Sequence, residues 1–156
     1  MTRSVLFVCT GNTCRSPLAE QFFKRICREA GVDAAVSSAG TQAAAGMPLS
    51  RGADAVFLKR GLGSVLHRAR RADAAMLRDA DVVYVMERMH RDFLASRFPE
   101  SAAKLAVLRE AAGLSPADVE DPVGADALEY EACAASIEEA LQIIVVRERE
   151  SNANPR

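Results

Sequence analysis

The sequence has no apolar run long enough to cross a bilayer and no apolar leader near its first residue, and these absences argue against a membrane or secreted protein. Charge of one sign is also missing, because 20 Lys and Arg against 21 Asp and Glu give a net charge of −1. Such a balance gives no basis for bulk binding to nucleic acid or to a membrane surface. We therefore expect a cytoplasmic protein with neither kind of partner.

Cysteine is sparse, with four residues in a chain of 156. In a reducing cytoplasm such cysteines serve catalysis, metal binding or core packing rather than structural disulfides. Cys27 and Cys133 fall on apolar faces of expected helices and are interpreted as core residues. The chain length favours one domain around one core, which we place at residues 1–150, followed by a flexible C-terminal tail over 151–156.

Strand and helix patterns alternate along the chain. Short apolar runs bounded by turn residues predict buried strands, at 4–8, 34–38, 81–86 and 104–108. Apolar residues at helical spacing predict helices, at 16–30, 49–60, 74–80, 88–98 and 126–146, with a frayed end beyond 146. This alternation favours an α/β domain of three layers, with a mostly parallel four-stranded sheet and helices on both faces.

The stretch FVCTGNTCRSPLAE, residues 7–20, runs from the first expected strand into the first expected helix, at the sheet edge where α/β proteins bind ligands. Gly11 and Asn12 easily adopt left-handed backbone conformations, so the loop can turn successive N–H groups toward an anion. The helix N-terminus adds its dipole, and Arg15 adds a planar fork suited to phosphate oxygens. The expected phosphate-binding residues are Thr10, Gly11, Asn12, Thr13, Cys14, Arg15 and Ser16.

A cysteine beside such an anion site predicts covalent phosphoryl transfer. The positive field stabilises a thiolate at Cys9, and the hydroxyl of Ser16 can hydrogen-bond to it. Cys9 would attack phosphorus and form a phosphocysteine. Asp121, in the loop VEDPVG, would protonate the leaving group and then activate the hydrolytic water. We expect no metal or other cofactor, because the N–H groups and Arg15 stabilise the developing charge, and inorganic phosphate is the product.

Residues 5–20 and the later Asp121-Pro122 resemble the low-molecular-weight protein tyrosine phosphatases, whose pattern is Cys-x5-Arg-Ser near the N-terminus and a late Asp-Pro. The resemblance extends over essentially the whole chain and implies a phosphatase acting on phosphotyrosine in proteins. It implies Cys9 as nucleophile, Arg15 as phosphate clamp and Asp121 as general acid, and a reversible disulfide between Cys9 and Cys14 on oxidation. The polar network that it implies around the loop consists of Asn12, Ser16, Ser38 and His67.

Two positions depart from the tyrosine-specific members of that family. Val123 follows Asp121-Pro122 where such members usually carry an aromatic residue, and the stretch 41–48 also lacks one, so a phenyl ring would have no stacking wall. Thr13 stands where many members have a larger aliphatic residue, and here the run CTGNTCRS resembles bacterial protein arginine phosphatases. The arginine phosphatases also tend to carry an aromatic residue after Asp-Pro, so this sequence matches neither subgroup fully. As specificity residues, Thr13 and Val123 leave phosphotyrosine and phosphoarginine both open; the family default favours phosphotyrosine.

Other readings of these residues stay open. Asp121 could be a turn former before proline, His67 a surface histidine, Ser38 a strand end and Cys14 a small core filler. An arsenate reductase on this scaffold would need a relay of further cysteines in the second half of the chain, and residues 72–99 contain none. A non-catalytic phosphate-binding module would require Asp121 to lie out of reach. Neither the oligomeric state nor the role of Glu87 follows from the sequence.

Overall fold

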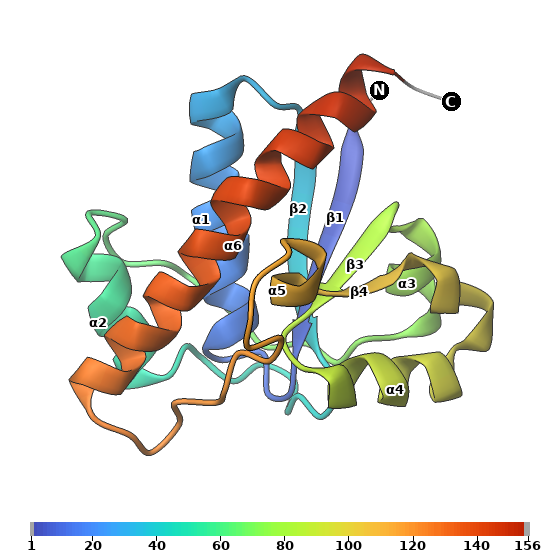
Figure 1. Ribbon diagram of the computed structural model, residues 1–156. Helices are drawn as coiled ribbons and strands as arrows, with labels where there is room; N and C mark the ends of the chain where they lie inside the picture. Colours follow the sequence, from blue (N-terminus) through green and yellow to red (C-terminus); the bar gives the residue numbers. More distant parts are fainter. Residues whose placement is uncertain (1, 155–156) are drawn as a thin grey trace.

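A computed structural model describes residues 2–154. Its single sheet has four strands, all parallel, in the order β2-β1-β3-β4. Their bounds are Arg3–Cys9 for β1, Ala34–Gly40 for β2, Val82–Val85 for β3 and Leu105–Val107 for β4. Figure 1 shows the sheet between two layers of helices. The predicted three-layer α/β fold is therefore confirmed, and the sheet is wholly parallel.

The helices divide between the two faces of the sheet. One layer is formed by α1 (Arg15–Ala30), α2 (Arg51–Lys59), α5 (Leu108–Ala111) and α6 (Ala127–Ala153), and the other by α3 (Ala74–Asp79), α4 (Arg88–Arg97) and the 3-10 helix η1 (Pro99–Lys104). The longer predicted helices are confirmed, and each begins within a few residues of its predicted start. The elements η1 and α5 were not predicted, because a single turn is too short to show a hydrophobic period.

Strand β1 is buried on both faces, as its continuous apolar run predicts. Val5 and Phe7 point into the core beneath α1 and α6, whereas Leu6 and Val8 point into the core beneath α3 and α4. This alternation follows from the two-residue period of a strand. Because β1 is anchored in two cores, the chain leaves the sheet at a fixed point after residue 9.

The end of α6 corrects an expectation. Residues 147–153, expected to be frayed, are helical as far as Ala153, and the last two residues of the expected tail lie outside the described part of the chain. Glu148 is fully buried and accepts hydrogen bonds from the hydroxyl of Tyr84 and from Nε of Arg3, each at 2.8 Å. Glu148 therefore fixes this stretch to the packed domain, although the residues on either side of it are exposed.

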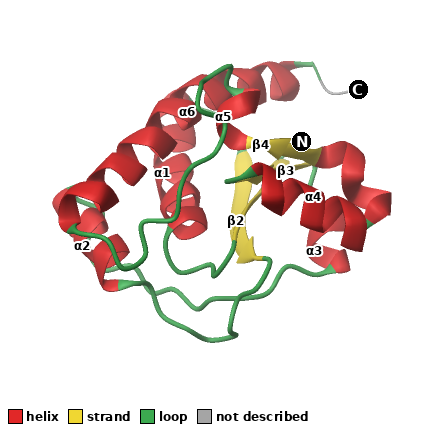
Figure 2. Cartoon of the chain, turned by 60° about the horizontal axis from the view of Figure 1, so that its bottom comes forward, coloured by secondary structure: helices red, strands yellow, loops and turns green. Residues whose placement is uncertain are grey.

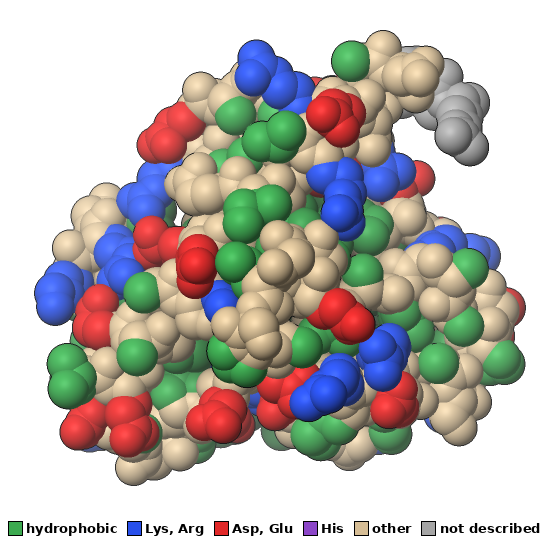
Figure 3. Space-filling model, viewed as in Figure 1, with side chains coloured by type: hydrophobic (Ala, Val, Ile, Leu, Met, Phe, Trp, Pro, Cys, Tyr) green, Lys and Arg blue, Asp and Glu red, His purple; other side chains and the backbone are tan. Residues whose placement is uncertain are grey.

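The surface mixes charges of both signs. In Figure 3 the blue Lys and Arg side chains and the red Asp and Glu side chains are interspersed over the visible face, without a field of one sign. Within residues 2–154, no helix has both the length and the apolar composition needed to cross a bilayer.

The carboxyl ends of the strands gather the long loops at one edge of the sheet. Figure 2, which brings this edge forward, shows the loops crossing it between the two helical layers. At the end of β2, Gly40 lies directly against the loop that follows β1. A Cβ atom at Gly40 would lie 2.5 Å from the carbonyl oxygen of Thr10 and 3.0 Å from the backbone nitrogen of Asn12. Only glycine fits beneath this loop.

We predict that Gly40→Ala displaces the loop after β1. The added methyl group would contact backbone atoms that cannot rotate away, at a cost of about 1 to 3 kcal/mol in the free energy of unfolding. In the aryl phosphate hydrolysis that the family resemblance implies, we expect at least a tenfold loss in the second-order rate constant, measured by steady-state kinetics alongside chemical denaturation.

The matched control is Gly63→Ala. Gly63 has a φ of 69° and nothing within 4 Å of an added Cβ, so this variant carries backbone strain of about 1 kcal/mol without touching the loop. Equal activity losses in the two variants would show that Gly40 matters only for stability.

Candidate active site

The loop between β1 and α1 is anchored by its carbonyl groups. Four of them accept hydrogen bonds from segments outside the loop. The carbonyl oxygens of Cys9, Thr10 and Thr13 accept from the backbone nitrogens of Thr41, Gln42 and Ser50, respectively, each at 2.9 Å. The carbonyl oxygen of Asn12 lies 2.6 Å from Nε2 of His67. The surrounding chain therefore pulls the loop carbonyls outward.

The outward carbonyls set the direction of the loop N–H groups. In a planar trans peptide the N–H points opposite to the C=O, so the N–H groups of Thr10, Gly11, Thr13 and Cys14 face the inside of the loop. Within residues 2–154 none of these four has a hydrogen-bond acceptor. Convergent free N–H groups at a helix N-terminus form an anion site.

Asn12 holds the loop in its curved shape. Within the loop, Asn12 has the left-handed backbone conformation, with a φ of 54°, and its side chain is fully buried. Its Nδ2 donates to Ser16 Oγ at 2.9 Å and to Ser38 Oγ at 3.0 Å, and its Oδ1 accepts from the backbone nitrogen of Arg70 at 3.0 Å. The residues expected as a polar network do lie together. Gly11 does not share the left-handed conformation.

The thiol of Cys9 lies beneath the loop, 3.0 Å from Oγ of Ser16. Ser16 accepts from Asn12 and lies 3.2 Å from the carbonyl oxygen of Ala39, to which it donates. A neutral Cys9 thiol can donate to this hydroxyl, and a thiolate can accept its proton instead of the Ala39 carbonyl. Ser16 thus offers a hydrogen bond to either state of the sulfur.

Arg15 extends from the first turn of α1 into the same site and is almost fully buried. Its Nη1 donates to Glu87 Oε2 and to the carbonyl oxygen of Val119, both at 2.8 Å. Burial disfavours the charged guanidinium, but the hydrogen bond to Glu87 and the nearby negative groups outweigh it and raise the pKa of Arg15. The fork is therefore held rigid and charged.

Asp121 reaches the site from the loop before α6. Its Oδ2 lies 3.7 Å from Nη2 of Arg15, its Oδ1 accepts from the backbone nitrogen of Val123 at 3.1 Å, and about half of its side chain is exposed. A cavity of about 240 Å³ is lined by Cys9, Thr10, Gly11, Thr13, Cys14, Arg15, Asp121 and Val123. A larger cavity of about 660 Å³, near Phe93 and Arg97, contains none of the predicted catalytic residues.

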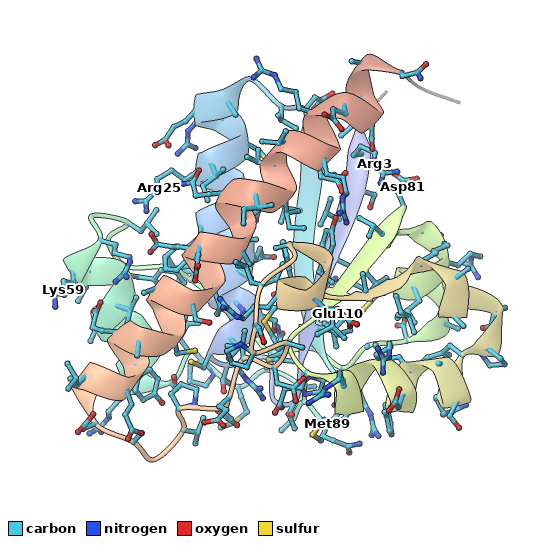
Figure 4. The ribbon with its side chains drawn as sticks, viewed as in Figure 1. Arg3, Arg25, Lys59, Asp81, Met89 and Glu110 are labelled. Carbon is cyan, nitrogen blue, oxygen red and sulfur yellow. The ribbon has the colours of Figure 1, made fainter. Side chains whose placement is uncertain are left out.

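Two further residues belong to the site: Glu87, whose role the sequence left open, and His90, which was not predicted. The backbone nitrogen of Glu87 donates to Nδ1 of His90 at 3.0 Å, and Nε2 of His90 lies 2.7 Å from Oγ1 of Thr10. Glu87 directly precedes α4, and His90 lies in its first turn. In Figure 4 the label of Met89 marks the start of this helix, and the label of Arg3 marks the opposite end of the sheet. The sequence did carry a signal for Glu87, because this residue follows a buried strand. A strand parallel to β1 ends at the same edge of the sheet as β1, where ligands bind.

All four cysteines are free and buried. The neighbouring thiol of Cys133, together with burial, raises the pKa of Cys14. Cys133 packs in the core as expected, in the same cluster as Cys14 of the phosphate-binding loop. The disulfide between Cys9 and Cys14 that the resemblance implies stays a prediction.

Comparison with known proteins gives consistent matches over nearly the whole chain. Residues 4–152 match the family described as low molecular weight phosphotyrosine protein phosphatase. A protein-arginine-phosphatase of Bacillus subtilis is 34% identical over 139 residues, covering 88% of this chain and 91% of that protein.

Two solved structures superimpose closely on the chain. One is a YwlE arginine phosphatase mutant with a phosphorylated active-site serine, with a TM-score of 0.92, 29% identity, and coverage of 96% of this chain and 98% of the other. The second is a low molecular weight protein tyrosine phosphatase of T. tengcongensis, with a TM-score of 0.88, 37% identity, and coverage of 94% and 99%.

The environment of His90 generates a prediction about pH. Burial, followed by the charge of Arg15, lowers the pKa of His90 from 6.5 to about 4. Because the unfolded chain binds a proton more readily, the free energy of unfolding should fall as pH drops from about 6.5 to about 4, by up to about 3 kcal/mol. NMR titration of the imidazole, assigned with His90→Asn, should show a neutral ring at pH 6. A ring that titrates near 6.5 would contradict the burial argument.

Proposed function

The chain belongs to the low-molecular-weight phosphotyrosine protein phosphatase family, and on this premise we propose that it dephosphorylates proteins through a phosphocysteine formed at Cys9. The observation that supports this most is the joint lining of one cavity by the thiol of Cys9, the guanidinium of Arg15 and the carboxyl group of Asp121. Nucleophile, clamp and acid thus come from distant parts of the sequence.

In the first step the thiolate of Cys9 attacks phosphorus and the bond to the leaving group breaks. The loop N–H groups and Arg15 stabilise the charge on the phosphoryl oxygens. Asp121, protonated at the start, transfers its proton to the leaving atom as that bond breaks. Its partial exposure and its position at the mouth of the cavity suit it to meet a group that arrives from solvent.

In the second step water displaces the sulfur. The carboxylate of Asp121 accepts a proton from the attacking water, the phosphorus–sulfur bond breaks, and inorganic phosphate leaves. The thiolate of Cys9 is regenerated, and the hydroxyl of Ser16 can then donate a hydrogen bond to the sulfur. Asp121 ends the cycle protonated, as it began.

The cavity favours phosphoarginine over phosphotyrosine as the substrate side chain. No aromatic residue is among its lining residues, so a phenyl ring finds only Val123 to pack against. A guanidinium requires hydrogen-bond acceptors, and Asp121 and the hydroxyl of Thr13 provide them at the rim. The arginine phosphatase of Bacillus subtilis, similar over most of the chain, supports this assignment. Phosphotyrosine, named in the description of the matching family, is the second candidate.

The remaining alternatives have less support. A cysteine relay for arsenate reduction would need a mobile second-half segment, whereas Cys133 lies in the packed helix α6. A non-catalytic module would need a remote Asp121, and this carboxylate lies 3.7 Å from the Arg15 guanidinium.

We predict that Cys9→Ser abolishes turnover of an aryl phosphate while phosphate binding persists, because the loop N–H groups and Arg15 are unchanged. Asp121→Ala should slow turnover by about a hundredfold to ten-thousandfold and allow a phosphocysteine to accumulate, detectable by intact mass after rapid acid quench. Retained turnover in Cys9→Ser would refute the nucleophile assignment.

For substrate class, we predict that a phosphoarginine peptide is turned over faster than a matched phosphotyrosine peptide by the same preparation. Thr13→Ile removes a polar group and narrows the cavity, so it should shift the ratio of rates toward phosphotyrosine by tenfold or more, a step of about 1.4 kcal/mol. Faster phosphotyrosine turnover by the unmodified protein, with a ratio insensitive to Thr13, would establish the second candidate.

A further inference from the structure

The hydroxyl group of Thr10 lies between two donors at the wall of the phosphate cavity. Its Oγ1 is 2.7 Å from Nε2 of His90 and 3.3 Å from Nη2 of Arg15. The guanidinium nitrogen can only donate, so it occupies one lone pair of the hydroxyl oxygen. If His90 is the donor in its hydrogen bond with Thr10, it occupies the second lone pair of Oγ1 and leaves the hydroxyl proton free.

The tautomer of His90 follows from its second nitrogen. Nδ1 lies 3.0 Å from the backbone nitrogen of Glu87, which can only donate, so Nδ1 is the acceptor. A neutral imidazole with Nδ1 as acceptor carries its proton on Nε2. The ring is buried beside a guanidinium, which favours the neutral state. His90 therefore donates to Thr10.

With both lone pairs of Oγ1 occupied, the hydroxyl proton of Thr10 must point elsewhere. Among residues 2–154 it has no acceptor, and Thr10 lines the cavity together with Cys9 and Arg15. The Arg15 nitrogen that contacts Thr10 faces the same space, since it also lies 3.7 Å from Asp121. The hydroxyl proton is therefore free to bond with a group that enters this cavity.

We infer that the Thr10 side chain donates a hydrogen bond to the bound phosphoryl group, and that His90 and Glu87 are positioning residues that fix its direction. This inference rests on the proposed phosphatase function and adds a side-chain donor to the backbone N–H groups. Glu87 acts twice, because its carboxylate orients Arg15 at 2.8 Å and its backbone N–H selects the tautomer of His90.

The donor requires no reorganisation when the substrate arrives. Its two partners hold the hydroxyl before binding, and preorganised donors of this kind stabilise developing charge most effectively. A hydrogen bond to a charged group that is lost from a dry site typically weakens binding about tenfold to a hundredfold.

The test measures binding of inorganic phosphate by calorimetry in the Cys9→Ser background, where turnover does not interfere. Thr10→Val, which keeps the shape and removes the hydroxyl, should bind phosphate about tenfold to a hundredfold more weakly. Thr10→Ser, which keeps the hydroxyl, should recover most of the loss. Thr2→Val, at the opposite end of β1, is the matched substitution away from the site.

The positioning role is tested by a double-mutant cycle. His90→Phe keeps a ring and removes both nitrogens; it should weaken phosphate binding with Thr10 present and have little further effect in Thr10→Val. Additive losses would show that His90 does not act through Thr10. In phosphate-bound protein, the Thr10 hydroxyl proton should also show an NMR correlation to phosphorus-31, absent in Thr10→Val. Such a correlation would not arise if Thr10 served only to hold Arg15.

Failure of this inference is distinguishable from failure of the proposed function. If Thr10→Val binds phosphate as tightly as its parent while Cys9→Ser remains inactive, the phosphatase assignment stands and the Thr10 donor is wrong. If Cys9→Ser retains turnover, the covalent mechanism itself fails.

Discussion

The outward pull on the carbonyl groups of residues 9–13 is the constraint on which the rest of the site depends. Backbone N–H groups from the loop after β2 and from the start of α2, together with His67, hold four of these carbonyls away from the cavity. Peptide planarity then turns the N–H groups inward. The positive character of the site is thus a property of backbone geometry, and Arg15 adds to it.

This geometry is transmitted through the sheet. Because β1 is buried on both faces, the chain leaves it at a fixed point, and the parallel neighbour β3 brings Glu87 to the same edge. Glu87 then orients Arg15 directly. The Asp121 loop is tied to the same sheet edge through Val119, whose backbone nitrogen donates to the carbonyl oxygen of Met86 at 2.9 Å and whose carbonyl accepts from Arg15. Three distant segments therefore converge through hydrogen bonds between them.

The sequence was sufficient to predict the fold class and the strand-loop-helix setting of Cys9 and Arg15, because both depend on local patterns. The grouping of Asn12, Ser16, Ser38 and His67 around the loop came from the family resemblance alone. Gly40 and His90 were not predicted. Their importance arises from contacts across the sheet edge, and nothing in the flanking residues marks a glycine under a loop or the tautomer of a buried ring. The charged end of α6 was misread for a similar reason, since the partners of Glu148 are distant in sequence.

The central claim is that the loop N–H groups themselves bind the phosphoryl group. Titration of nitrogen-15 labelled Cys9→Ser protein with inorganic phosphate tests it most directly. The account predicts saturable downfield shifts of the amide protons of Thr10, Gly11, Thr13 and Cys14, all with one dissociation constant. Phosphate that binds without moving these four amides, or that moves only amides elsewhere in the chain, would contradict it.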